Sequence, residues 1–120
     1  MKLTLIQVAT FVKKFKQLGL IDEDLQALER QIVESPEAGA VMAGTGGVRK
    51  IRFAPPSWNI GKSGATRVCY ALFTTIDTVY LLTMFGKNQQ ANLTADEKKI
   101  IKAWMTRTRK WLGHEPRPKG

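Results

Sequence analysis

The side chains of this sequence best suited to chemistry are lysines and arginines on or beside predicted β-strands. Lys50 and Arg52 lie two positions apart in an alternating segment, so they share one face of a strand. Arg67 interrupts an otherwise apolar segment, where it needs a specific partner because burying an unpaired charge is costly. Lys87 follows the end of a further strand. Arginine binds phosphate through paired hydrogen bonds and lysine as a point charge, so this set favours an anionic partner.

Other kinds of active site have little support. Cys69 lies in an apolar segment and the single histidine, His114, lies in the C-terminal tail, which argues against a Cys–His pair or a metal cluster. Asp77 is the only acid in the strand region. The sequence GKS at 61–63 resembles the end of a phosphate-binding P-loop, but Pro56 stands where that loop requires glycine. We therefore expect no metal and no cofactor.

The N-terminal third predicts a short edge strand and two helices. The strand covers about 3–8, and the first helix is capped by Thr10 and ends at Gly19. The second helix begins at Asp22 with an acidic first turn, which suits the helix dipole, and Pro36 lies just past its end.

After a turn-rich connector at 39–47, the spacing of the apolar residues changes from the period typical of a helix to the alternation typical of a strand. Strands are predicted over about 48–54, 65–75 and 79–85, with a tight turn at Asp77. Short connections between successive strands favour an antiparallel meander. The last two strands are apolar on both faces, so we expect them to be central and covered.

A third helix closes the domain. Thr94 and Glu97 have the spacing of a capping box, and the helix is predicted to end near Gly113. Six apolar residues repeat at helical spacing along it: Ile100, Ile101, Trp104, Met105, Trp111 and Leu112. The prediction is a single domain over 1–112, followed by a basic, flexible tail over 113–120.

Bulk composition narrows the function classes. The 120 residues suit one domain, and an apolar share of 43% suffices for a packed core. No apolar run is long enough to span a membrane, so we expect no membrane partner. A single cysteine precludes an internal disulfide and makes a cytoplasmic location the default expectation.

The charge is strongly positive and unevenly distributed. The chain has 19 lysines and arginines against 10 acids, a net charge of +9. Residues 1–40 hold five cations and six acids, whereas 41–93 hold six cations and one acid, and 94–120 hold eight cations and three acids. The middle and the end of the chain therefore build a cationic surface, which favours nucleic acid as a partner.

Four segments, in order and at the right spacing, resemble the RelE/HigB-type toxins of bacterial toxin–antitoxin pairs, closest to the HigB branch. They are TGGVRKIR at 45–52, GATRVCY at 64–70, YLLTMFGKN at 80–88 and LTADE at 93–97. The similarity runs from about Glu34 to Trp104, and the first 33 residues match in helical pattern alone.

The resemblance implies an α+β fold in which two N-terminal helices pack on one face of an antiparallel sheet, with a C-terminal helix. Members cleave messenger RNA, typically in the ribosomal A site, and a cognate antitoxin silences them. It therefore implies three partners: the ribosome, messenger RNA and a HigA-like antitoxin.

Carried over residue by residue, the family's catalytic basic positions fall on Lys50, Arg52, Arg67 and Lys87. The resemblance further implies RNA contacts by Arg49, Lys62 and Asn88. The chain departs from the RelE pattern at Asn88, where that pattern has arginine, and no tyrosine follows before the closing helix.

The family chemistry needs no histidine, because the neighbouring 2′-hydroxyl of the RNA attacks the phosphate. The enzyme orients that attack and stabilises the charge that develops, which clustered cations can do by electrostatic preorganisation. The hypothesis is that Arg67 clamps the scissile phosphate while Lys50, Arg52 and Lys87 share proton transfer and charge stabilisation. Lys62 would contact the substrate or the ribosome.

Two alternatives stay open. A ParE-like toxin shares the architecture and acts on DNA gyrase, but such relatives lack the cations on the sheet. A non-catalytic RNA-binding module would bind through salt-dependent phosphate contacts without cleavage.

Overall fold

The computed structural model describes residues 2–59 and 66–118, and in them the chain forms one five-stranded sheet and three α-helices. The strands are β1 (Thr4–Gln7), β2 (Ala40–Val41), β3 (Arg49–Phe53), β4 (Thr66–Phe73) and β5 (Thr78–Gly86). The α-helices are α1 (Ala9–Gln17), α2 (Asp22–Glu34) and α3 (Ala95–Leu112), and short 3₁₀ turns cover Pro56–Trp58 and Thr74–Ile76. The predicted α+β class is confirmed.

The sheet is mixed, with the strand order β1-β5-β4-β3-β2. The predicted meander is confirmed, since β3, β4 and β5 pair antiparallel in succession, and β2 adds a short strand within the expected connector. β1 pairs parallel with β5, so the prediction of a wholly antiparallel sheet is wrong at this edge. β1 and β5 are far apart in sequence, so no hairpin forces them to be antiparallel. β1 therefore adds to the free edge of β5 and runs in the same direction as β5.

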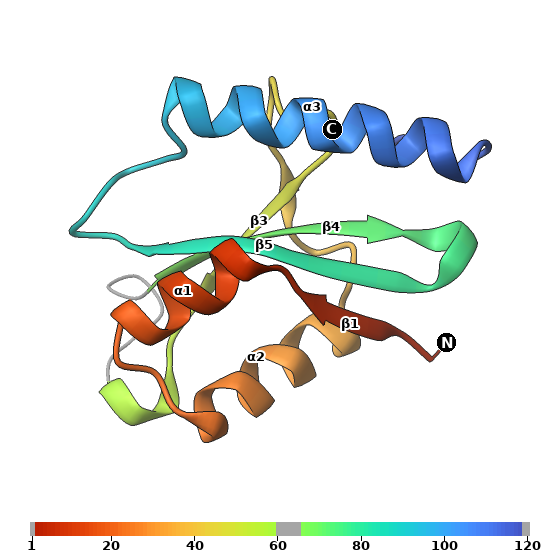
Figure 1. Ribbon diagram of the computed structural model, residues 1–120. Coiled ribbons are helices and arrows are strands. Elements are labelled where there is room, and N and C mark those ends of the chain that lie inside the picture. The colour runs from red at the N-terminus through yellow and green to blue at the C-terminus, as the bar shows by residue number, and fades with distance from the viewer. Residues whose placement is uncertain (1, 60–65, 119–120) are drawn as a thin grey trace.

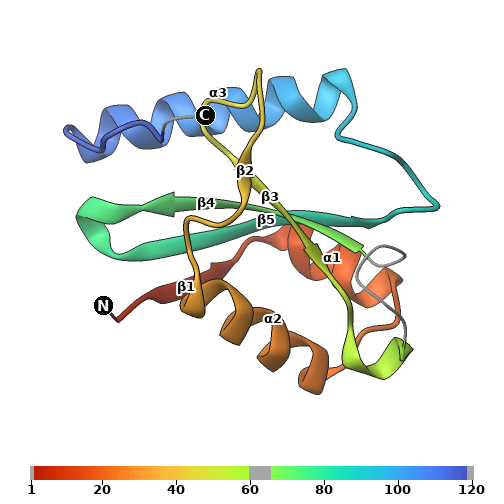
Figure 2. The ribbon, with the colours of Figure 1, turned by 180° about the vertical axis from the view of Figure 1, so that it is seen from behind.

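The helices lie on both faces of the sheet (Figure 1). α1 and α2 cover one face, as expected, and α3 runs along the other; the view from behind shows the same three layers (Figure 2). Two apolar cores result. One joins the α1 and α2 side chains Phe11, Leu28 and Ile32 to the sheet, and the other joins Met105 of α3 to the opposite face.

β4 and β5 are central and buried on both faces, as predicted. The one-to-one pairing of β4 with β5 shifts once, between the pairs Cys69–Thr83 and Tyr70–Leu81. This shift leaves Leu82 without a partner in β4. Such a bulge turns consecutive side chains toward the same face. Leu82 and Thr83 consequently both face α3, and both line a hollow beneath it.

The helix starts follow local hydrogen bonds. The capping box of α3 is confirmed, because the Thr94 side chain accepts from the Glu97 N–H, and the Glu97 carboxylate accepts from the Thr94 N–H. The prediction that Thr10 caps α1 is wrong, since the N-cap is Val8 and makes no side-chain hydrogen bond. The Val8 N–H donates to Leu81 in β5, so α1 begins where the strand pairing ends. Gly19 follows α1 with a φ of +71°, a conformation that favours glycine.

The apolar residues of α3 differ in burial. Met105 is buried and Trp104 packs on the sheet, but Ile100 is 70% exposed and Trp111 is 81% exposed. No helix in the described residues is long and apolar enough to cross a membrane.

The segment after α3 folds back on the domain as far as the structure describes it. The Glu115 carboxylate accepts hydrogen bonds from the backbone N–H and the hydroxyl of both Thr74 and Thr75, at 2.7–3.0 Å. Burial raises the pKa of Glu115, but these hydrogen bonds outweigh it and hold the pKa below its ordinary value. The contact ties residues 113–118 to the turn between β4 and β5.

Candidate functional site

Three of the predicted site residues lie on the face of the sheet that α3 covers in part. Arg52 of β3 and Arg67 of β4 are direct cross-strand partners, and Lys50 pairs with Cys69 one step along the same face. Residues that pair across strands share a face, so the three side chains are neighbours. We call Lys50, Arg52, Arg67 and Lys87 the cationic cluster.

Repulsion between the positive charges of the cationic cluster should destabilise the folded protein, which argues against a purely structural role for these residues. Like charges placed directly opposite each other on two strands destabilise a sheet. Within the described residues no carboxylate compensates this pair, because Arg67 donates only to the Thr66 carbonyl, at 3.2 Å, and the exposed Arg52 side chain makes no hydrogen bond. The arrangement is therefore suited to receive an anion from outside the chain.

Lys50 is half-buried beside the start of α3. Its Nζ donates to the Asn92 side-chain oxygen at 3.5 Å, and the same oxygen accepts from the Leu93 N–H at 2.9 Å. Asn92 thus orients the ammonium group from the loop between β5 and α3. The sequence carries no motif that marks Asn92, because the contact joins residues far apart in the chain.

Beneath Lys50, Cys69 is completely buried. Burial raises the pKa of the Cys69 thiol to about 12, the charge of Glu97 adds to the rise, and the charge of Lys50 opposes it. At neutral pH this thiol stays protonated, and only the thiolate is a strong nucleophile. The structure agrees with the sequence in giving Cys69 a packing role.

Lys87 follows the last residue of β5 at the same end of the sheet. Gly86 pairs with Thr66, next to the Arg67–Phe85 pair, so Lys87 leaves the sheet one residue beyond the arginines. The Gln89 side chain accepts from the Gly86 N–H at 3.0 Å and closes the turn that presents Lys87. Asn88 is exposed in this turn, and Lys62 lies outside the described residues.

Arg49 is not brought to the cluster. It alternates with Lys50 and so faces the α1 and α2 side, where its guanidinium donates to the carbonyls of Glu37 and Gly39, both at 2.8 Å. The Tyr70 hydroxyl is buried on the same side, where it donates to the Pro36 carbonyl at 2.7 Å and accepts from the Gly39 N–H. Together Arg49 and Tyr70 fix the chain between α2 and β2.

The two tyrosines are packing residues. Tyr70 is fully buried, and Tyr80 meets Trp104 edge to face with 5.2 Å between ring centroids. His114 is exposed after the C-terminal end of α3, whereas the cluster contacts the loop before its N-terminal end. Among the described residues, no three His, Cys, Asp or Glu side chains gather to hold a metal ion.

Comparison with known proteins identifies the architecture. No family model matches the sequence. A solved structure of the E. coli toxin RelE, a double arginine-to-alanine mutant in the free state, superposes with a TM-score of 0.52. The match covers 76% of this chain and 90% of that chain at 17% identity.

This protein has the RelE fold. At that level of identity the likeness establishes the fold alone, and the chemistry must be argued from the site. Within the RelE fold, this chain gathers Lys50, Arg52 and Arg67 on one face at the ends of β3 and β4.

Proposed function

We propose that this protein is a toxin that cleaves messenger RNA on the ribosome and is neutralised by an antitoxin. The observation that carries the proposal is the cross-strand pair of Arg52 and Arg67, which no carboxylate of the described residues compensates, with Lys50 beside it. Two arginines that repel each other in the free protein gain most when a phosphate comes between them. The RelE fold and the segments that resemble RelE/HigB-type toxins support the same conclusion.

In the proposed mechanism the nucleophile belongs to the substrate. The 2′-hydroxyl attacks the adjacent phosphorus, the 5′-oxygen leaves, and a 2′,3′-cyclic phosphate forms. Arg67 binds the non-bridging oxygens, and fixed positive charge there stabilises the transition state more than the ground state. Lys50, held by Asn92, together with Arg52 and Lys87, shares proton transfer and charge stabilisation.

The proposed partners are the ribosome with its messenger RNA, and a HigA-like antitoxin. Assignment to the HigB branch rests on the four segments at 45–52, 64–70, 80–88 and 93–97 and is part of this proposal. Lys62 and Asn88 are proposed as RNA contacts around the cluster.

The test is to map messenger RNA 5′ ends after brief induction of the native chain, Arg67→Ala and Arg30→Ala. Arg30 is an exposed arginine on α2 and serves as the matched control. We expect cuts confined to translated reading frames with the native chain and with Arg30→Ala, and no such cuts with Arg67→Ala.

Two other results would replace the proposal. Growth arrest with intact messages and a DNA-damage response would favour a ParE-like action on gyrase. RNA binding without cleavage, unaffected by any single substitution in the cluster, would favour a plain RNA-binding module.

A further inference from the structure

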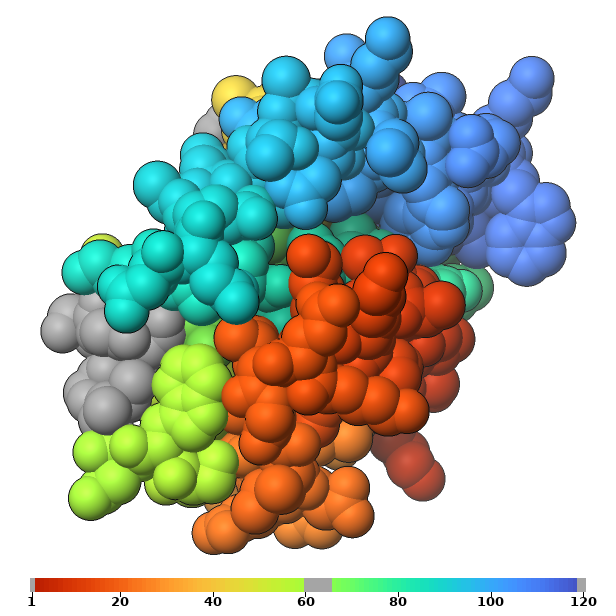
Figure 3. Space-filling model, turned by 60° about the vertical axis from the view of Figure 1, so that its left-hand side comes forward, coloured from red at the N-terminus to blue at the C-terminus, as the bar shows by residue number. Residues whose placement is uncertain are grey.

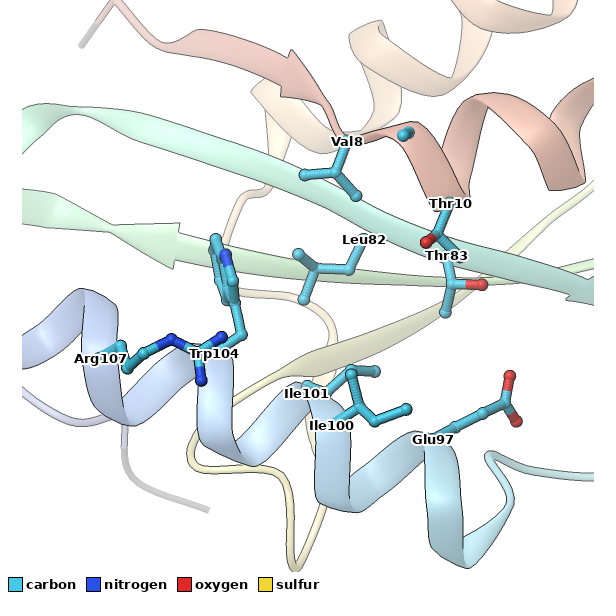
Figure 4. A pocket seen from close by; sticks show the side chains of 10 residues that line it. Val8, Thr10, Leu82, Thr83, Glu97, Ile100, Ile101, Trp104 and Arg107 are labelled. Carbon is cyan, nitrogen blue, oxygen red and sulfur yellow. The ribbon is translucent and has the colours of Figure 1, made fainter.

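A trough runs along the flank of α3 that faces the edge strand β1. Its first part is a hollow of about 420 Å³ between α3, β5 and the start of α1 (Figure 4). A second hollow of about 300 Å³ continues it toward the end of α3, and Trp104 and Arg107 line both. In the space-filling view the trough separates α3 from α1, with β5 at its floor (Figure 3).

One wall of the trough is an apolar stripe of α3 whose two outer members, Ile100 and Trp111, are largely exposed. Ile100, Trp104 and Trp111 succeed one another at spacings of four and seven residues, which puts them on one side of the helix. Trp104 is anchored by Tyr80 beneath it, whereas Ile100 and Trp111 are among the most exposed large apolar side chains in the described residues. An apolar seam with this period is the surface to which a second helix packs.

The floor of the trough contains a polar group in need of a partner. Thr83 is 3% exposed, its Oγ1 has no hydrogen-bond partner, and its side chain lines the trough beside Leu82. Buried hydroxyls in native proteins are almost always hydrogen-bonded, because an unsatisfied one costs about 1–3 kcal/mol. The bulge in β5 brings the Thr83 side chain to the floor of the trough.

The charges beside the trough select the occupant. α1 has three lysines and no acid, and α3 has six cations and two acids. Both helices that border the trough are thus positive, and the whole chain is +9. Complementary charge favours a negatively charged partner, and the same charges disfavour a second copy of this chain.

We propose that the trough receives an acidic amphipathic helix of another polypeptide, laid along α3 from Glu97 to Trp111. That span corresponds to about 21 Å of helix, or about four turns. The apolar side of the helix covers Ile100 and Trp111, and its acidic side faces the lysines of α1 and α3. Identifying this helix as part of the antitoxin rests on the proposed function, but its binding to the trough does not.

The trough and the two cations of β3, Lys50 and Arg52, lie on different strands. The trough lies over β5 and the start of α1, whereas Arg52 and Lys50 lie on β3, beyond β4. A helix in the trough therefore holds the partner without itself covering these two cations. Substitutions in the trough should abolish partner binding and leave cleavage intact.

The test uses the full-length chain and a designed 18-residue peptide with leucine at helical seam positions and glutamate elsewhere. Binding is measured by calorimetry against the native chain, the double variant Ile100→Ser with Trp111→Ser, and Val33→Ser. Val33 is an exposed apolar residue of α2 on the other face of the sheet and is the matched control. All three substitutions leave the charge unchanged. We expect the double variant to bind about tenfold more weakly or worse, and Val33→Ser to bind within about twofold of the native chain.

A scrambled peptide of the same composition shows whether binding depends on the apolar seam or only on the net charge of the peptide. Equal binding of the scrambled peptide, or no binding of the designed one, overturns the proposal. So does a concentration-dependent dimer of the native chain in sedimentation that the double variant abolishes, because a second copy would then fill the trough. Seam-dependent binding by a chain that cuts no messenger RNA supports the trough and overturns the nuclease instead.

Discussion

The two faces of the sheet differ in how completely their side chains are satisfied. On the face covered by α1 and α2, two buried polar side chains are fully bonded: the Tyr70 hydroxyl makes two hydrogen bonds and the Asp24 carboxylate makes three. On the face covered by α3, the Thr83 hydroxyl and the Nε of Arg109 are buried without partners, and two arginines oppose each other. We therefore expect polar groups to stabilise the fold more on the first face than on the second.

The largest expected contrast in stability is between Phe11 and Ile100. Phe11 is fully buried against the sheet, so Phe11→Ala should lower the free energy of unfolding by about 3–5 kcal/mol. Ile100 is mostly exposed, so Ile100→Ala should change it by less than about 0.5 kcal/mol. Urea unfolding followed by circular dichroism measures both. Equal losses would contradict the exposure of Ile100 in the free protein.

Asp24 gives the α2 side a pH dependence. Burial raises the pKa of Asp24, but hydrogen bonds from the Ile21 and Ser57 N–H groups and from the Ser57 hydroxyl outweigh it, so the folded pKa lies below the ordinary value of 3.8. A depressed folded pKa means that the stabilisation is complete above the unfolded pKa and is lost as the pH falls through the folded one. Asp24→Asn should cost about 1–3 kcal/mol at pH 7, because an amide nitrogen cannot accept these bonds. The difference from the native chain should shrink below pH 3.8 in urea titrations; a constant difference across pH would refute this role.

Two buried threonines provide a smaller and closely matched contrast. Thr66 donates from its hydroxyl to the Phe53 carbonyl at 2.8 Å, whereas the Thr83 hydroxyl has no partner. Thr66→Val should therefore lower the free energy of unfolding by about 1 kcal/mol, and Thr83→Val should leave it unchanged or raise it. Thermal unfolding of the two variants side by side distinguishes them. A loss at Thr83 as large as at Thr66 would remove the argument for an unsatisfied floor in the trough.

Much of this fold could be predicted because it depends on local signals. The capping box at Thr94, the acidic start at Asp22 and the apolar runs of β4 and β5 each act within a few residues. The parallel pairing of β1 and the short strand β2 depend on contacts between distant segments, which no local pattern records. The exposure of Ile100 and Trp111 could not be predicted either, because a helical stripe shows which residues share a side but not how far the sheet extends beneath them.

The candidate site divides in the same way. Alternation along β3 correctly put Lys50 and Arg52 on one face, and the same rule separates Arg49 from them. The cross-strand pairing of Arg52 with Arg67 depends on the register between β3 and β4, which cannot be predicted from the local sequence pattern. The contact of Asn92 with Lys50 depends on where the loop before α3 returns to the sheet.

The most direct test of the division between faces compares Arg67 with Arg49, two arginines on adjacent strands that point to opposite sides of the sheet. Purified native chain, Arg67→Ala and Arg49→Ala are assayed for cleavage of ribosome-bound messenger RNA and for urea unfolding. We predict that Arg67→Ala loses about 100-fold or more in cleavage rate, with its stability unchanged or raised because the opposing charge of Arg52 is relieved. Arg49→Ala should lose about 1–2 kcal/mol of stability and cleave normally while folded. Normal cleavage by Arg67→Ala, or lost cleavage by a stably folded Arg49→Ala, would contradict the account.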